Sequence, residues 1–422
     1  MRVRTIILAL CVYAMAMPAV AATKVIRFGK LWDGDRVITN AIVVVENDRI
    51  KSVGTSDSAI PPGAEVIDLR RFTGIPGMID AHTHMTYFWD QAPGTSPRPA
   101  PPRHVAVTVF LSQQNAKRTL EAGVTSIRDL NASGGADFAM RDLINMGAMI
   151  GPRMFVSGQG LRGVRNRPAN APPMTGTPAE EAAANAKRAI EAGADVVKVF
   201  GSVGGFDNVN MDQTVTYEEM KAMVDTTHQM GKKIAIHSYG PDGARDAVRA
   251  GTDTLEHATD LDDATIAEMA RKNVIYVPTI DHNQYYVENA DNFKFPPASV
   301  ERLKDYIRRN FETAKKAFQA GVKFAMGSDA VYNGFGLNTR ELEWYVKLGM
   351  TPAQALQTAT KNGAEMLGRQ TDLGSVKAGF FADIVAVEGD PTTDIIAATK
   401  NVRWVMKGGA VVVDKTRATK SN

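Results

Sequence analysis

The sequence predicts an α/β protein: a TIM-like (β/α)8 barrel inserted into a small composite β-sandwich domain that both ends of the chain form. Two patterns support this prediction. The middle of the chain repeats one unit, in which an amphipathic helix ends at Gly or Asn and a short apolar strand follows, whereas both ends alternate as strands. A length of 422 residues, with 44% hydrophobic and 23% charged content, suits one large domain and a satellite.

Residues 1–21 are predicted to be a cleavable secretory signal peptide. Arginines near the start precede an apolar run from Thr5 to Met17, and Ala19-Val20-Ala21 has the small residues of a cleavage site. The run is shorter than the roughly 20 residues that a membrane span needs, and Pro18 ends it. We therefore expect a secreted or periplasmic protein. Cys11 is the only cysteine, so the mature chain would contain no disulfide.

Both ends of the mature chain, residues 22–72 and 371–422, read as β-structure. The expected strands are Val25–Phe28, Ala41–Val45, Ile50–Val53, Ala382–Val387, Val402–Met406 and Ala410–Val413. Neither end has enough strands for an independent sheet with a buried face. The two ends are therefore predicted to combine into one β-domain.

Residues 73–370 are predicted to form the barrel. Helix stops precede six apolar strands, at Glu121-Ala122-Gly123, Glu191-Ala192-Gly193, Gln229-Met230-Gly231, Arg249-Ala250-Gly251, Lys272-Asn273 and Gln319-Ala320-Gly321. Capping boxes begin helices at Thr177, Thr216 and Thr351. Strands at 74–80 and 153–157 complete a set of eight parallel strands. An open doubly wound sheet is the alternative, but it favours a Gly-rich turn after the first strand, where this chain has His-Thr-His.

Six potential metal ligands fall at the expected C-terminal ends of barrel strands, which converge on one face. They are His82, His84, Lys198, His237, His257 and Asp329. His82 and His84 are two residues apart on a strand and share a face. Each residue also has a simpler explanation: a solvent-facing histidine pair, a lysine paired with a carboxylate, a core histidine or a helix cap. The joint pattern favours a metal centre.

The order His-x-His, Lys, His, His, Asp, with Gly74-Ile-Pro-Gly77 before it and Gly327-Ser-Asp329 at the eighth strand, resembles the amidohydrolase superfamily. The segments 198–205, 237–240 and 255–257 are most similar to its imidazolonepropionase-like branch, which includes secreted Xaa-Pro dipeptidases, carboxypeptidase-like amidases and ochratoxin-hydrolysing enzymes. The resemblance implies that Lys198 is an N6-carboxylysine whose carbamate bridges two metals.

The resemblance and the ligand types together imply two divalent ions, with zinc favoured. One ion would bind His82, His84, Asp329 and the carbamate, and the other would bind the carbamate, His237 and His257. A hydroxide bridging the metals would attack the amide, and Asp329 would act as the catalytic proton carrier. The expected enzyme is a metal-dependent hydrolase of C–N bonds.

Two loops, at 87–103 and 158–178, are expected to lie on the catalytic face and to contact the substrate. Trp89, Tyr239, His282 and Arg162 are candidate substrate contacts. The simpler alternative is that Arg162, like Arg165 and Arg167, is a solvated surface charge and that the aromatic residues fill a subunit contact.

We expect a dipeptide or N-acyl amino acid as substrate, with aromatic amides such as ochratoxin A as candidates. The alternatives are a lactonase or cyclic-amide hydrolase on the same metals, or a ligand-binding scaffold without catalysis. The net charge of +3, with both signs interspersed, implies neither nucleic acid nor a membrane as partner. A homo-oligomer is expected.

Overall fold

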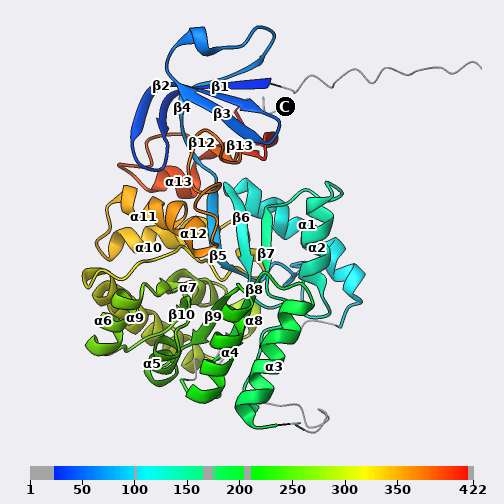
Figure 1. Ribbon diagram of the computed structural model, residues 1–422, viewed down its shortest axis with the longest axis vertical. Coiled ribbons are helices and arrows are strands. Elements are labelled where there is room, and N and C mark those ends of the chain that lie inside the picture. The colour runs from blue at the N-terminus through cyan, green and yellow to red at the C-terminus, as the bar shows by residue number, and fades with distance from the viewer. Residues whose placement is uncertain (1–22, 99–101, 165–173, 175, 204–210, 417–422) are drawn as a thin grey trace, which may run out of the picture.

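The computed structural model describes residues 23–98, 102–164, 174, 176–203 and 211–416. The predicted signal peptide, Arg165 and Arg167 lie outside these residues. Figure 1 shows two regions along the long axis: a β-domain and, below it, a larger body of helices and strands. Among the described residues, no helix combines the length and the apolar composition that a membrane span requires.

The strands are β1 (Thr23–Trp32), β2 (Val37–Glu46), β3 (Arg49–Gly54), β4 (Glu65–Pro76), β5 (Met78–Thr83), β6 (Val124–Asp129), β7 (Arg153–Val156), β8 (Val196–Phe200), β9 (Lys233–Ser238), β10 (Thr254–His257), β11 (Ile275–Val277), β12 (Ile384–Val387), β13 (Val402–Lys407) and β14 (Ala410–Asp414). The α-helices are α1 (Val105–Glu121), α2 (Ala136–Asn145), α3 (Pro178–Glu191), α4 (Tyr217–Gln229), α5 (Pro241–Ala250), α6 (Asp263–Lys272), α7 (Ile280–Glu288), α8 (Ala290–Phe293), α9 (Pro297–Gln319), α10 (Glu341–Lys347), α11 (Pro352–Thr358), α12 (Lys361–Met366) and α13 (Ile396–Lys400).

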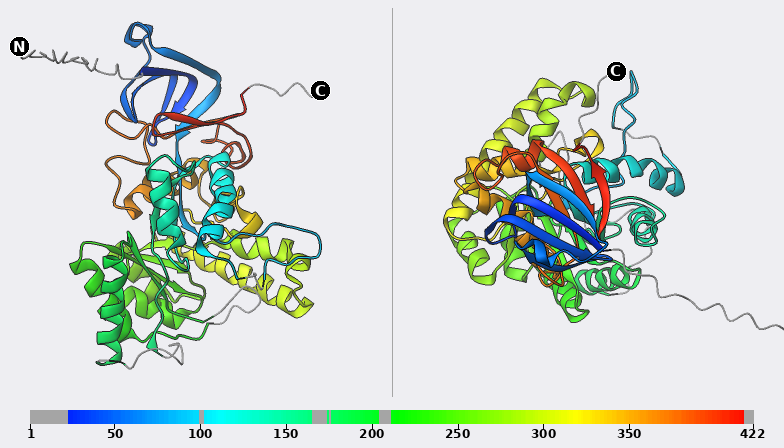
Figure 2. Two further views of the ribbon diagram at one scale, coloured as in Figure 1. Left: turned by 90° about the vertical axis from the view of Figure 1, so that its right-hand side faces the viewer. Right: turned by 90° about the horizontal axis from the view of Figure 1, so that it is seen from above.

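The β-domain is composite, because strands from both ends of the chain share one sheet of order β14-β13-β12-β4-β1-β2-β3. Strand β4 joins the two halves: it pairs in parallel with β1 and antiparallel with β12. Figure 2 shows the N-terminal strands (blue) and the C-terminal strands (red) in one sheet, where β4 and β12 are neighbours. The prediction of a composite β-domain built from both chain ends is confirmed, and its described strands form one continuous mixed sheet. Phe28 and Trp404, from its two halves, pack in one buried core.

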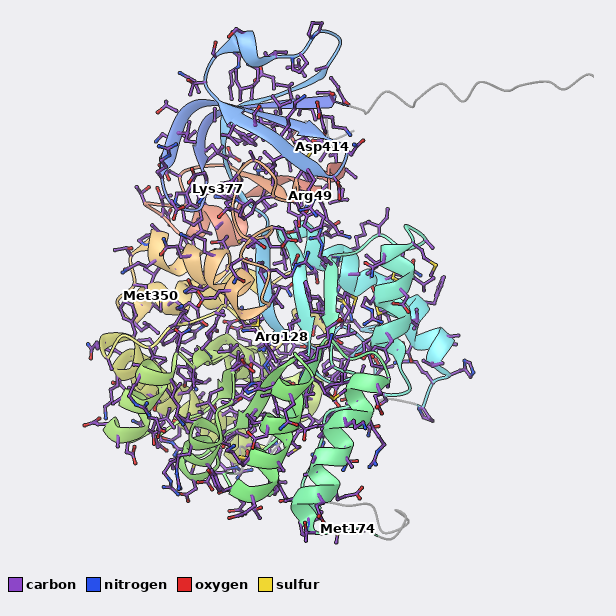
Figure 3. All side chains as sticks on the ribbon, viewed as in Figure 1. Arg49, Arg128, Met174, Met350, Lys377 and Asp414 are labelled. Carbon is purple, nitrogen blue, oxygen red and sulfur yellow. The ribbon has the colours of Figure 1, made fainter. Side chains whose placement is uncertain are left out.

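Side-chain contacts also join the N-terminal and C-terminal parts of the β-domain. Arg49, labelled in Figure 3, stacks on Phe381 at 3.5 Å from the ring centroid and donates to the Gly379 carbonyl. Lys377 donates to Asp35 at 2.7 Å. These contacts lie at the surface, where such ion pairs contribute about 1 kcal/mol or less. The buried apolar core is therefore the main stabilising element of the β-domain.

The barrel consists of seven regular strands and an eighth extended segment, residues 322–330. Strands β5-β6-β7 and β8-β9-β10-β11 form two parallel sheets. The first gap between them closes through the Asp195 amide, which donates to the Val156 carbonyl at 2.8 Å. The eighth segment closes the other gap: Phe324 bridges Tyr276, and the Ala81 amide donates to the Met326 carbonyl at 2.7 Å.

The predicted helix boundaries hold in the structure. Each of the six predicted stops follows the end of a helix, and its Gly or Asn has a positive φ. The left-handed conformation at these positions costs glycine no Cβ clash. Thr177, Thr216 and Thr351 each form the reciprocal side-chain and backbone bonds of a capping box. These short-range signals fix where each strand begins.

The predicted first barrel strand, Gly74 to Asp80, is wrong as a single element. Strand β4 continues to Pro76 in the β-domain, β5 begins at Met78, and Gly77 separates them. The Gly77 amide donates to the Asp383 carbonyl at 2.8 Å, which ties the junction to the C-terminal segment. A Cβ on Gly77 would lie 2.1 Å from Thr125 Oγ1. Only glycine fits where the two regions meet.

Replacing Gly77 with alanine tests this junction. We expect Gly77→Ala to destabilise the protein by about 1–3 kcal/mol, because the added methyl group must displace Thr125. Gly54→Ala is the matched control, since no heavy atom lies within 4 Å of a Cβ there. Thermal unfolding followed by circular dichroism makes the comparison. Equal midpoints for the two variants would contradict the close contact at Gly77.

Candidate functional site

All six predicted ligands line one cavity at the C-terminal end of the barrel. The cavity has a volume of about 200 Å³ and is lined by His82, His84, Tyr87, Arg98, Asn131, Arg162, Lys198, Phe200, His237, Tyr239, His257, His282 and Asp329. The six candidate ligands are buried. Residues nearly 250 positions apart in the sequence thus meet in one place.

Each ligand is placed by a strand or by the residue that follows one. His82 lies in β5 with His84 just beyond it, Lys198 lies in β8, His237 in β9 and His257 at the end of β10. Asp329 lies near the end of the eighth segment, where its amide donates to the His82 carbonyl. His257 and Asp329 have φ values of 71° and 49°, in the left-handed region that non-glycine residues rarely adopt. Such strained backbone is concentrated at functional sites.

Asp329 is the centre of the cluster. Its Oδ1 lies 3.0 Å from His84 Nε2 and 3.6 Å from His82 Nε2. On its other side, Oδ2 lies 3.1 Å from His282 Nε2. One ligand atom each from His82, His84 and Asp329 fall within 4.8 Å of one another. This grouping can hold a metal ion between two imidazoles and a carboxylate.

Three of the imidazoles have a hydrogen-bond partner at Nδ1. His82 Nδ1 lies 2.7 Å from Glu256 Oε2, and His84 Nδ1 lies 3.5 Å from the Asn131 carbonyl oxygen. Because both partners are acceptors, Nδ1 carries the proton and Nε2 keeps its lone pair for a metal. His257 Nδ1 similarly pairs with the Thr279 hydroxyl at 2.7 Å.

Burial sets the charge state of the site. Burial, together with the positive charge of Lys198, lowers the pKa of His82 to about 4, so this imidazole is neutral at pH 7. Burial also lowers the pKa of Lys198 to about 8. Burial opposes the ionisation of Glu256, but the Arg128 guanidinium and the bond from His82 outweigh it and lower the Glu256 pKa to about 2.

The donor atoms fit a divalent metal. Among the described residues, His82 Nε2, Lys198 Nζ and Asp329 Oδ1 are buried polar atoms without a hydrogen-bond partner. Leaving such atoms unpaired costs free energy, so a group that pairs with them stabilises the site. Neutral imidazole nitrogens with a carboxylate oxygen are a donor set typical of zinc.

Three of the four predicted substrate contacts line the cavity: Arg162, Tyr239 and His282. His282 contacts Asp329 directly. Trp89 does not line the cavity. It is buried in an aromatic cluster with Tyr285, Tyr286, Phe293 and Tyr332, and its indole N–H donates to Thr95. Adjacent aromatic residues in the first loop could not be told apart from the sequence.

Several site residues were not predicted. Tyr87 stacks on the His84 ring at 4.8 Å and bonds to Asn131, while Arg98 reaches the cavity from the same loop. Below them, Arg128 donates to Glu256 at 2.8 Å. The signals available were weak: Glu256 directly precedes His257, but nothing in the sequence points to Arg128 as its partner.

Asp80 was also missed, and it fixes the eighth segment. Its carboxylate accepts from the Ser328 amide at 2.9 Å, the Ser328 hydroxyl at 2.6 Å and the Asn338 side chain at 2.9 Å. Burial raises the pKa of Asp80 to about 6, although these donors oppose the shift. Asp80 thereby holds Ser328, and the neighbouring Asp329, against β5.

The chain is similar to known proteins along most of its length. The amidohydrolase family model matches residues 73–412. The ochratoxinase of Aspergillus niger is 29% identical over 432 residues, which cover 92% of this chain and 86% of that protein. Its crystal structure superposes with a TM-score of 0.78, at 27% identity, over 93% of this chain and 96% of that one. A crystal structure of a Xaa-Pro dipeptidase with methionine bound in its active site has a TM-score of 0.82 at 30% identity, covering 92% and 99% of the two chains.

Removing the negative charge behind His82 should weaken metal binding. We expect Glu256→Gln to raise the dissociation constant for Zn²⁺ about 10–100-fold, because the amide no longer balances Arg128 or strengthens the His82 donor. Competition with a chromophoric chelator measures the constant. Glu268→Gln, at a surface ion pair with Lys272, is the control and should leave it unchanged. An unaltered zinc affinity in folded Glu256→Gln would refute the role of Glu256.

Proposed function

The chain belongs to the amidohydrolase family and is a hydrolase of amide bonds, and from that premise we propose that it cleaves dipeptides or N-acyl amino acids at a two-metal centre. The observation that carries the proposal is a single cavity that combines six buried candidate ligands with an arginine available to a substrate carboxylate. The named relatives, an ochratoxinase and a Xaa-Pro dipeptidase, support the same class of substrate.

The residues that would hold the ions divide into two groups. His82, His84 and Asp329 would hold one ion, and His237 and His257 the other, with Lys198 between them as a carbamate. Two divalent ions would supply a water of lowered pKa and polarise the carbonyl of the scissile amide. The unpaired Lys198 amine, enclosed by the other ligands, supports its conversion to an anionic oxygen donor.

Asp329 is the proposed proton carrier. Its carboxylate would accept the proton of the attacking water and return it to the leaving nitrogen. The 3.1 Å contact between His282 Nε2 and Asp329 Oδ2 supports a positioning role for His282 rather than direct substrate contact. With His84 on the other oxygen, the carboxylate is held from both sides.

Arg162 is the proposed receptor for the substrate carboxylate. Its guanidinium stacks on Phe200 at 4.3 Å from the ring centroid and has no hydrogen-bond or ion-pair partner among the residues that the structure describes. A planar guanidinium can bind a carboxylate through two parallel hydrogen bonds. Tyr87, Phe200 and Tyr239 give the cavity aromatic surfaces that would receive an apolar or aromatic acyl group.

Two further parts of the proposal concern the setting of the enzyme. The composition of residues 1–21 supports export to the periplasm or beyond. A homo-oligomer remains our expectation for the assembled enzyme. The exposed Phe110 and Met146, at 70% and 72% accessibility, support an apolar contact in such an assembly.

The substrate class can be tested with purified enzyme on matched compounds. We expect N-benzoyl-phenylalanine to be hydrolysed with a kcat/KM at least tenfold above that of its carboxamide, because only the acid can engage Arg162. Arg162→Met should raise KM about tenfold or more with a smaller change in kcat, whereas Arg188→Met, on the surface of α3, should change neither. Asp329→Asn is the inactive reference. Preference for lactones, or for the carboxamide, would overturn the proposal.

Carboxylation of Lys198 gives a pH-dependent prediction. Only the neutral amine reacts with carbon dioxide, and the Lys198 pKa of about 8 makes this form dominant above pH 8. At constant dissolved carbon dioxide, activation of the metal-free protein by zinc should therefore quicken up to about pH 8 and then level off. In ¹³C-bicarbonate, wild type should give a carbamate carbon resonance and Lys198→Arg none. An identical spectrum from both would rule out the modification.

A further inference from the structure

We propose that a second cavity, at the N-terminal end of the barrel, binds a small carboxylate with an apolar body. This cavity lies among the residues that begin β8 and β9, whereas His237 lies near the C-terminal end of β9. It has a volume of about 280 Å³ and is lined by Arg128, Phe155, Asp195, Val196, Gly231, Lys232, Lys233, Met366, Leu367 and Gly368. None of these residues belongs to the metal site cavity.

Arg128 is the buried cation of this second cavity. It lies near the middle of the molecule in Figure 3 and is only 2% exposed. Its guanidinium donates to the Ala81 carbonyl, the Thr254 hydroxyl and the Glu256 carboxylate. Arginine has five N–H donors, so these three bonds hold the group rigidly and leave two donors for a ligand.

Two lysines add positive charge to the cavity. Lys232 and Lys233 are half-buried at the start of β9. The Lys233 stem runs past Gly368, where an added Cβ would lie 3.7 Å from Lys233 Cε. Lys233 has a distant carboxylate partner, Asp253, at 3.9 Å. Lys232 forms no ion pair with the residues that the structure describes, so its ammonium group can turn towards an anion in the cavity.

The one carboxylate in the lining does not cancel this charge. Asp195 accepts from Arg141 at 3.0 Å and from the Val156 amide at 3.1 Å, so its charge is already balanced within the protein. Arg128 is likewise paired with Glu256, so the charge left for a ligand comes mainly from the two lysines, which favours an anionic ligand.

The remaining walls select the kind of anion. Phe155, Val196, Met366 and Leu367 provide apolar surface beside the cationic groups. A fully hydrated inorganic anion would leave this surface unused, whereas an aliphatic or aromatic acid would bury its body there and present its carboxylate to Arg128 and the lysines. Sites of this kind combine an apolar lining with a few fixed polar groups.

Binding of 4-fluorobenzoate to the zinc-loaded enzyme, followed by ¹⁹F NMR, tests the site. We expect saturable binding that Lys232→Gln/Lys233→Gln weakens at least tenfold, because two of the three cations are lost. The matched control, Lys187→Gln/Lys304→Gln, removes two exposed lysines and should bind like wild type.

Arg162→Met separates the two cavities. It should leave the second-cavity binding intact, whereas 4-fluorobenzoate held at the metal site would be lost with that arginine. Saturable binding that survives the loss of Lys232 and Lys233, binding that disappears in Arg162→Met, or no binding at millimolar probe would each overturn the proposal. Failure of the substrate experiment would leave this result unaffected, because the two cavities share no residue.

Discussion

The closure of the barrel between β5 and the eighth segment is the constraint on which the site depends. The Asp329 amide donates to the His82 carbonyl at 2.7 Å, and the His84 amide donates to the Ala330 carbonyl at 3.0 Å. These two bonds set residues from the first and last strands side by side before any side chain is considered. Asp80, in β5, adds further hydrogen bonds between β5 and this part of the chain by accepting from Ser328 and Asn338. The short contacts of Asp329 with its histidines follow from this backbone geometry.

The polar residues inside the barrel form two layers beside the contact between β5 and the eighth segment. The ligands face the cavity, and a deeper layer neutralises and orients them. Glu256 would be costly to bury as an isolated charge, and so would Arg128, but their 2.8 Å ion pair and surrounding donors satisfy both groups. His82 gains a fixed tautomer from the same carboxylate. Burial thus serves both the stability and the chemistry of the centre.

The sequence could predict features that depend on residues close together in the chain, but not most contacts between distant residues. Helix ends at Gly123 or Gly251 and capping boxes such as Thr177 were predictable, because each depends on residues within four positions. The ligands could be grouped because barrel topology brings strand ends together. The partnership of Arg128 with Glu256 could not, since it joins side chains 128 positions apart inside the barrel.

The same distinction explains the errors. Gly74 to Asp80 looks like one apolar strand, but it is divided at Gly77, where β4 pairs with the C-terminal β12 and the glycine packs against Thr125. Trp89 and Tyr87 are neighbours of similar character in a loop. Trp89 is buried in the aromatic cluster, whereas Tyr87 packs against that cluster and also stacks over His84. Both positions depend on tertiary contacts with α7 and the segment around Tyr332. Local pattern carries no such information.

The central position of β4 has a consequence for biogenesis. About 300 residues separate β4 from its partner β12, so at roughly 5–20 residues per second the ribosome needs about 15–60 s to deliver the second strand after the first. During that interval one edge of β4 has no neighbour and could pair with another nascent chain. The barrel can fold during this interval, whereas the sheet of the β-domain can be completed only after the C-terminal strands have been synthesised.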